Sequence, residues 1–457
     1  MINFPKGFLW GSATSAYQIE GAAEQYGRGP SIWDEFCKIE GNTANGENGS
    51  IACDHYHRFE QDVKLMADMG VKAYRFSISW SRVLPDGTPS QVNPEGIDFY
   101  NRLIDTLLEH EIVPWITLYH WDLPQHLQAE HDGWLNEAVI DYFVEYASIC
   151  FNSFGDRVKN WITINEAWVV SVLGHGQGVF APGHVSNSEP YQVAHNLILA
   201  HAKAVHAYRE NYQSNQGGRI GITNNCDWRE PLTNSQADKD AAQRALEFFL
   251  GWFADPIYLG DYPESMKQRV GDRLPVFTTD QKAMVLGSSD FFGLNHYTTM
   301  YASDASGKVL ETSVYGNGGL SEDQDVSLSI DESWSLTDMQ WAVVPWGCRK
   351  LLNWIDERYD SPEIFITENG CAYDDVLIDG IVDDQRRIDY LDSYLTACSS
   401  AINDGVNLQG YFVWSLLDNF EWALGYEKRF GVHYVNFETG ERTPKQSAKW
   451  ISVLMKT

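Results

Sequence analysis

The sequence lacks the patterns by which cysteine and histidine usually bind metals or build a disulfide framework. Its seven cysteines are odd in number and scattered over 457 residues, without a CxxC pair. Such usage is typical of reduced thiols in a cytoplasmic protein. His120 has no second and third histidine or carboxylate at ligand spacing. We therefore expect neither a metal nor another cofactor.

Long apolar runs and basic residues are scarce as well. No run reaches the roughly 18 apolar residues of a membrane helix, and the first residues lack the basic and apolar regions of an export signal. The 33 Lys and Arg residues are outnumbered by 63 Asp and Glu, which gives a net charge of -30. A field of that sign repels nucleic acids and anionic lipids. We expect a cytoplasmic protein with neither as a partner, in an oligomeric state that the sequence does not indicate.

Aromatic residues, in contrast, are abundant: the chain has 17 Trp and 23 Tyr. Their rings offer flat apolar faces with a polar edge, which suits stacking on sugar rings. A well-packed aromatic core explains most of them equally well, so the abundance alone does not decide between these readings.

Eight short runs rich in β-branched and aromatic residues recur along the chain, each followed by a helix-like segment. The predicted strands are residues 7–13, 73–79, 114–120, 160–166, 219–225, 290–297, 363–369 and 408–416. Helical patterns lie between them, at residues 96–109, 137–154, 191–211, 239–251 and 343–358. This alternation predicts an α/β fold, a (β/α)8 TIM barrel with elaborated βα loops, although an open doubly wound sheet has the same pattern.

No linker, low-complexity tract or internal repeat divides the chain. We therefore expect a single catalytic domain over residues 1–457. Residues 303–332 are polar and rich in Gly, Ser and Asp, and we interpret them as a long surface loop after the sixth strand.

Polar and aromatic residues gather at the carboxyl ends of the predicted strands, where barrel enzymes carry their chemistry. These residues are Gln18, Arg75, His120, Trp121, Asn165, Glu166, Asn295, Tyr297, Glu368 and Trp414. A polar residue at one strand end means little. Their presence at most of the ends predicts a site, because carboxylates there are costly to bury without a partner.

Glu166 and Glu368 end the fourth and seventh strands, which lie across the mouth of a barrel from each other. Glycoside cleavage uses two carboxyl groups, one that protonates the leaving oxygen and one that attacks or assists at the anomeric carbon. A retaining enzyme holds them about 5–5.5 Å apart and an inverting one about 6.5–9.5 Å apart. The strand positions do not supply this distance, so both outcomes stay open at this point.

Five spaced motifs identify a family resemblance. Trp161-Ile-Thr-Ile-Asn-Glu166 resembles the acid/base motif of glycoside hydrolase family 1, and Ile366-Thr-Glu-Asn-Gly370 resembles its nucleophile motif. Residues 8–21, 74–82 and 414–422 are similar to three further motifs, in the same order. The resemblance implies a barrel enzyme that retains anomeric configuration, with Glu368 as nucleophile and Glu166 as acid/base.

The resemblance also implies roles for the surrounding residues. Arg75 and Tyr297 would keep Glu368 charged and oriented. The expected sugar-binding residues are Gln18, His120, Trp121, Asn165, Asn295, Tyr297, Trp341, Trp414, Glu421 and Trp422, with Trp414 as the platform beneath the ring. Trp341 resembles the residue that stacks on the leaving group, and Trp168, Leu173, His175 and Asn225 are expected at the leaving-group side.

The expected substrate is a small β-glucoside or short cello-oligosaccharide such as cellobiose, which indicates a β-glucosidase of carbohydrate metabolism. Galactosides and fucosides remain alternatives, and so does a non-catalytic sugar-binding relative, although such relatives generally lose one carboxylate. Glu421 stands where phospho-sugar members have Ser, so an unphosphorylated glycoside is expected. Ala167 replaces the Pro that usually follows the acid/base in the family, a departure for which we expect a small effect.

Overall fold

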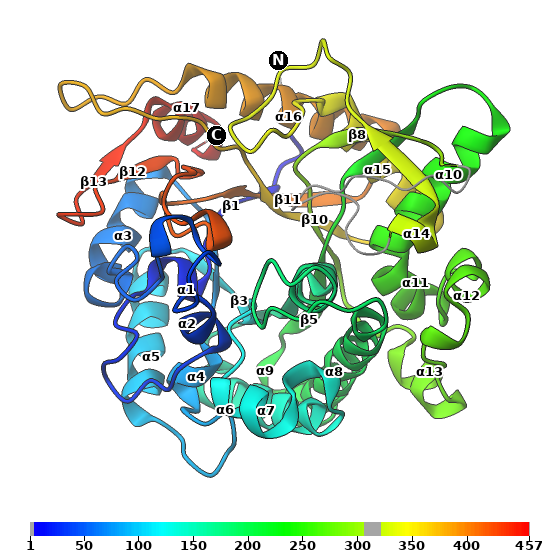
Figure 1. Ribbon diagram of the computed structural model, residues 1–457. Coiled ribbons are helices and arrows are strands. Elements are labelled where there is room, and N and C mark those ends of the chain that lie inside the picture. The colour runs from blue at the N-terminus through cyan, green and yellow to red at the C-terminus, as the bar shows by residue number, and fades with distance from the viewer. Residues whose placement is uncertain (1–3, 306–320, 457) are drawn as a thin grey trace.

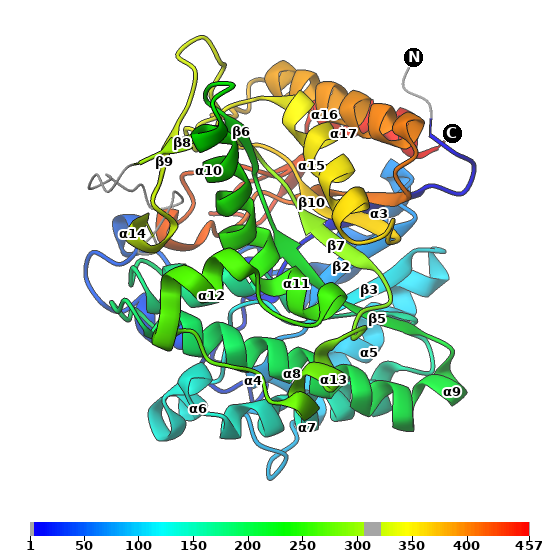
Figure 2. The same cartoon turned by 90° about the vertical axis from the view of Figure 1, so that its right-hand side faces the viewer.

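The computed structural model describes residues 4–305 and 321–456. Eight parallel strands close into a barrel in the order β1-β11-β10-β7-β5-β4-β3-β2 (Figures 1 and 2). They are β1 (Leu9–Ala13), β2 (Ala73–Ser77), β3 (Val113–Tyr119), β4 (Asn160–Asn165), β5 (Arg219–Asn225), β7 (Phe292–Asn295), β10 (Ile364–Asn369) and β11 (Leu408–Trp414). Because β1 pairs with both β2 and β11, the predicted barrel is confirmed and the open sheet is wrong.

Six long helices run between successive strands of the barrel, and one further helix follows the last barrel strand. They are α3 (His55–Met69), α5 (Pro94–Glu109), α7 (Ala138–Phe154), α8 (Glu189–Asn211), α15 (Pro345–Arg358), α16 (Gln385–Asp404) and α17 (Gln446–Met455). They contact one another in the order α15, α16, α17, α3, α5, α7 and α8, so they cover the barrel as a continuous layer (Figure 1). Among the described residues, none of the helices has the length and apolar character that crossing a bilayer requires.

Shorter elements decorate the barrel. The short helices are α1 (Ala16–Ile19), α2 (Ile32–Phe36), α4 (Trp80–Val83), α6 (Gln125–His131), α9 (Gln213–Gln216), α10 (Gln236–Leu246), α11 (Trp252–Leu259), α12 (Glu264–Val270), α13 (Thr279–Val285) and α14 (Ser321–Gln324). The remaining strands are β6 (Trp228–Pro231), β8 (Thr299–Asp304), β9 (Val326–Ser329), β12 (His433–Val435) and β13 (Arg442–Pro444).

Two predictions need correction in detail. The helix expected at 239–251 begins at Gln236, and a π-helical turn over Glu247–Gly251 continues it into α11. The segment 303–332 is not only a loop, because the end of β8, the helix α14 and the strand β9 lie within it; residues 306–320 lie outside the described part. β9 pairs antiparallel with β8, which pairs with β6, in a small sheet beside the barrel. Because this small sheet lies away from the main core, the segment 303–332 is polar. That polar composition hid the strand pattern in the sequence.

Aromatic rings fill the inside of the barrel. Trp115 packs against Phe291, Phe365 and Phe412, with ring centroids 4.8–5.3 Å apart. The Arg219 guanidinium lies 4.7 Å from the centroid of Phe365, where a cation meets the negative face of a ring. Most of these residues belong to the first half of their strands, so this plug closes one end of the barrel. Space for a ligand therefore remains at the carboxyl ends.

The regular strand register breaks where two key strands approach the open end. On β4 it shifts against β5 between Ile162 and Asn165, and on β10 it shifts against β7 between Ile366 and Glu368. Such irregularities locally redirect side chains and are frequent beside active sites. Here they directly precede the two glutamates that the sequence singled out.

Candidate active site

A cavity of about 530 Å³ lies at the carboxyl ends of the barrel strands, and both Glu166 and Glu368 line it. Thirteen of the predicted site residues share its wall: His120, Trp121, Glu166, Trp168, Leu173, Asn225, Asn295, Tyr297, Trp341, Glu368, Trp414, Glu421 and Trp422. Gln18, Arg75 and Asn165 lie directly behind this wall, fully buried and in contact with residues of it. The structure thus brings together residues from positions 18 to 422.

Glu368 is contacted by a buried cation and by a hydroxyl donor. The buried guanidinium of Arg75 forms a short ion pair with Oε1 of Glu368, and the Tyr297 hydroxyl donates to Oε2 at 2.6 Å. Arg75 is itself fixed by Asn165 Oδ1 at 2.5 Å and Thr117 Oγ1 at 3.3 Å. Burial and the charge of Glu368 raise the pKa of Tyr297, so the phenol keeps the proton that it donates. An opposite charge and a donor both favour the carboxylate form that a nucleophile needs.

Glu166 is in a different environment. Its pKa is raised well above the ordinary value, first by burial and then by the negative charge of Glu368. Asn295 Nδ2 donates to Glu166 Oε1 at 2.6 Å, which opposes this shift without cancelling it. The backbone at Glu166 is in the left-handed region, with φ 51°, and its N–H donates to the Thr223 carbonyl at 2.9 Å. Glu166 is therefore positioned as a protonated acid.

The sugar-binding end is rich in oriented polar groups. Gln18 Nε2 lies 3.0 Å from Asn419 Oδ1, 2.9 Å from the Phe420 carbonyl and 3.4 Å from Glu421 Oε2. Burial, followed by the charge of Glu368, raises the pKa of Glu421 to about 8. A protonated Glu421 offers both a donor and an acceptor, which suits recognition of a hydroxyl group.

His120 presents an unused donor. Asn165 Oδ1 accepts from Arg75 and Asn295, so the amide nitrogen of Asn165 faces His120 Nε2 at 3.1 Å. Nε2 is then the acceptor, and Nδ1 carries the proton. Burial and Arg75 lower the pKa of His120 well below the ordinary value, so the ring is neutral. Nδ1 is buried with no partner among the described residues, as expected for a group that awaits a ligand hydroxyl.

Aromatic rings surround the same end. The His120 ring lies 6.0 Å from both Trp414 and Trp422 and nearly parallel to each, at 14° and 13°. Trp121 packs against Trp422 at 4.6 Å, and its indole N–H donates to the Asn165 carbonyl at 2.9 Å. Trp121 lines the cavity, but its N–H is already used inside the protein.

At the leaving-group side, one predicted residue is not in the cavity wall. Trp168, Leu173 and Asn225 line it, whereas His175 is buried elsewhere, with Nδ1 2.9 Å from the Val170 carbonyl. Burial lowers the pKa of His175 to about 4, so it is a neutral packing residue. The expectation that His175 lines the cavity is therefore corrected: the residue directly follows the π-helical segment Val169–Gly174, and its side chain contacts the backbone of that segment.

Other cavity residues were missed by the sequence argument. Apolar side chains close to the leaving-group side include Val169, Phe249, Met300, Ile330 and Met339, and Asp227 raises the pKa of Glu166 through its charge. They come from segments after different strands and belong to no recognisable motif. The sequence therefore carried no signal that set them apart from other apolar residues.

In residues 4–305 and 321–456, no group of three or more His, Cys, Asp or Glu side chains has an arrangement that could hold a metal ion. The chemistry of the cavity lies in its carboxyl groups. A protonated acid beside an ionised carboxylate at the mouth of a (β/α)8 barrel defines the site of a glycoside hydrolase.

The chain belongs to the family described as glycosyl hydrolase family 1, whose model matches residues 1–457. Beta-glucosidase 42 of Arabidopsis thaliana is 52% identical over 99% of this chain and 94% of its own length. The crystal structure of a rice β-glucosidase superposes with a TM-score of 0.95 at 46% identity, covering 99% of each chain. A family 1 β-glucosidase from Thermotoga maritima gives 0.93 at 45%, covering 100% of this chain and 98% of its own. The predicted family, fold and enzyme class are confirmed, while the individual residue roles stay predictions.

The raised pKa of Glu421 leads to a prediction about stability. Between its ordinary pKa and about 8, the folded protein keeps a proton on Glu421 that the unfolded chain has lost. Stability from this group is therefore lost as pH rises through that window. Glu421→Gln cannot ionise, so its melting temperature should exceed that of the wild type by more at about pH 9 than at about pH 5. Thermal unfolding at both pH values measures this, and an unchanged difference would contradict the assignment.

Ala167 leads to a second prediction. A proline there would favour an extended conformation at residue 166, whereas Glu166 has φ 51° and is held by Thr223 and Asn295. A proline would therefore add no preorganisation that these contacts do not already supply. We expect Ala167→Pro to raise kcat by less than about tenfold. A larger gain, measured with an aryl β-glucoside, would show that Glu166 is loosely held.

Proposed function

We propose that the protein is a retaining β-glucosidase that removes terminal β-D-glucosyl residues from β-glucosides and short cello-oligosaccharides such as cellobiose. The observation that carries the proposal is the placement of Glu166 and Glu368 in one cavity, where Arg75 and Tyr297 contact Glu368. Burial and the charge of Glu368 raise the pKa of Glu166 there. Support comes from the relatives of similar length that are named β-glucosidases. A relative with this fold, the β-glucosidase from Thermotoga maritima, has been solved in complex with deoxynojirimycin, a sugar-like ligand.

The proposed reaction has two displacements. Glu368 attacks the anomeric carbon, the bond to the leaving oxygen breaks, and Glu166 gives its proton to that oxygen. The glycosyl-enzyme ester removes the negative charge of Glu368, so the pKa of Glu166 falls. Glu166 then takes a proton from water as the water oxygen attacks the anomeric carbon, which releases the sugar and restores both groups.

Galactosides and fucosides form a second candidate substrate class. Gln18 and Glu421 lie 3.4 Å apart at the sugar-binding end, and we infer that they contact the hydroxyl whose orientation separates glucose from galactose. Because a protonated Glu421 can donate as well as accept, it can serve both orientations, and Gln18 fixes its position. The Thermotoga maritima relative has been solved with galacto-hydroximolactam, which favours this alternative.

The proposed cellular location is the cytoplasm. Its support is the state of the seven cysteines, all of which are buried free thiols. A pool of unmodified thiols is compatible with a reducing compartment, where cellobiose or another imported glucoside would be hydrolysed.

The decisive experiment compares wild type, Glu166→Ala and Glu368→Ala on p-nitrophenyl β-glucoside, with azide rescue and proton NMR of the first anomer. We expect β-glucose first, α-glucosyl azide from Glu368→Ala and β-glucosyl azide from Glu166→Ala. Glu363→Ala is the matched control. This partly exposed glutamate directly precedes the amino end of β10, the strand that carries Glu368, and it forms an ion pair with Arg219. It should stay within about twofold of wild type. α-Glucose as first product, or activity in both variants, would overturn the assignment.

A further inference from the structure

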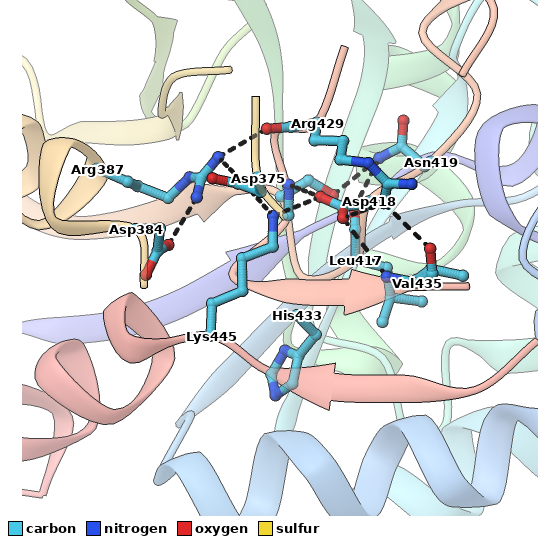
Figure 3. A network of polar contacts seen from close by, with 12 residues as sticks. Asp375, Asp384, Arg387, Leu417, Asp418, Asn419, Arg429, His433, Val435 and Lys445 are labelled. Atoms are coloured by element: carbon cyan, nitrogen blue, oxygen red, sulfur yellow. Dashed lines mark hydrogen bonds and ion pairs between the residues drawn. The ribbon is translucent and has the colours of Figure 1, made fainter. Parts of the chain in front are cut away.

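Behind the sugar-binding end lies a buried set of six charged residues, which we name the anchor network: Asp375, Asp384, Arg387, Asp418, Arg429 and Lys445 (Figure 3). Three carboxylates face three cations, so the charges balance. Five of the side chains are at most 3% exposed, and Arg429 is 19% exposed. None of the six lines the cavity.

The anchor network connects the segments after β10 and β11 to α16 and to the start of α17. Lys445, just before α17, contacts Asp375 Oδ2 at 2.5 Å and Asp418 Oδ1 at 2.7 Å. Arg387 of α16 contacts Asp375 Oδ2 and Asp384 Oδ2, each at 2.6 Å. Asp375 follows the nucleophile strand β10, and Asp418 follows β11. The two strand ends that border the sugar-binding side are thereby tied to the same helices (Figure 3).

Asp418 holds both ends of one loop. It lies near the start of the segment between β11 and β12, and its carboxylate accepts from residues at the far end of that segment. Gly431 N–H donates to Oδ1 at 2.9 Å, and Arg429 Nη1 donates to Oδ2 at 2.7 Å. The approach is close: a Cβ at Gly431 would lie 2.0 Å from the Asp418 nitrogen, so only glycine fits.

The same loop supplies a large part of the cavity wall. Glu421, Trp422, Leu424, Lys428 and Phe430 line the cavity. Residues 428–431 face two sides in turn. Lys428 and Phe430 face the cavity, whereas Arg429 and Gly431 contact Asp418. A movement of Asp418 would therefore move the cavity side chains on the opposite side of the same short stretch.

Glu166 and Glu368 are fixed by other groups. Asn295 and Thr223 hold the first, and Arg75 and Tyr297 hold the second. None of these four residues belongs to the anchor network. A disturbance of the network should therefore affect sugar recognition more than the two carboxyl groups.

We propose that the anchor network, through Asp418, positions Glu421 and Trp422 and so sets how the enzyme distinguishes sugar hydroxyl orientations. Asp418 and its partners are positioning residues that do not touch the sugar. A buried ion pair is weak evidence for stability, because apolar residues of similar volume often do as well, whereas fixing one arrangement is a recognised use of such groups. The inference deepens the proposed function and rests on it.

The test uses Asp418→Asn, with Arg429→Met as a second variant, since the partly exposed Arg429 can be replaced at less cost to folding. Steady-state kinetics are measured on p-nitrophenyl β-glucoside and p-nitrophenyl β-galactoside. We expect KM for the glucoside to rise at least about fivefold with kcat changed less than about threefold. The glucoside-to-galactoside ratio of kcat/KM should change at least about threefold. That ratio does not depend on how much of the preparation is folded.

Arg442→Met is the matched control. Arg442 forms an equally buried ion pair with Asp62, with both side chains 0% exposed, and neither residue lines the cavity. Its link to Asp418 is indirect, through Cys53, whose carbonyl accepts from Arg442 and whose thiol donates to the Asp418 carbonyl. Arg442→Met should lower the melting temperature and leave the glucoside-to-galactoside ratio of kcat/KM unchanged. An unchanged ratio and KM in Asp418→Asn and Arg429→Met would overturn the inference, and so would an equal change in Arg442→Met. A wild type inactive on both substrates would instead refute the proposed function.

Discussion

The site depends on one electrostatic relation, the negative charge of Glu368 acting on the nearby Glu166 in a buried cavity. Arg75 and Tyr297 keep the charge on Glu368, and that charge together with burial raises the pKa of Glu166. These surroundings favour the protonated form of Glu166, as the proposed mechanism requires of its acid. The difference comes from the neighbours, since both residues are glutamates that line the same cavity.

The barrel makes this relation possible. An aromatic plug around Trp115 fills one end and leaves the carboxyl ends of the strands free. Register shifts on β4 and β10 directly precede the two glutamates. Arg75 reaches Glu368 and Asn165 from β2, so a single buried cation links three strands of the barrel. The chemistry is thus built on strand ends, which are more rigid than loops.

Much of this could be predicted from the sequence, for identifiable reasons. Strand cores such as Trp161-Ile-Thr-Ile are apolar and β-branched, so their positions were clear, and Glu166 and Glu368 follow from them. What failed depended on local helix geometry or on distant contacts. His175 was expected in the cavity wall from the resemblance alone, and its contact with the Val170 carbonyl depends on local backbone geometry that the sequence does not show. β9 was missed because its sheet lies outside the main core. Phe249 and Met300 reach the cavity from segments whose pattern is that of ordinary core packing.

The most direct test of the account is the titration of Glu166 itself. Carbon-13 NMR of the labelled side-chain carboxyl would follow Glu166 in the wild type and in Glu368→Gln, which removes the charge and keeps the shape. The account predicts a pKa for Glu166 that lies well above the ordinary glutamate range in the wild type and falls in the variant, where the charge of residue 368 is gone. An ordinary pKa in the wild type, or the same value in both proteins, would contradict the coupling on which the mechanism rests.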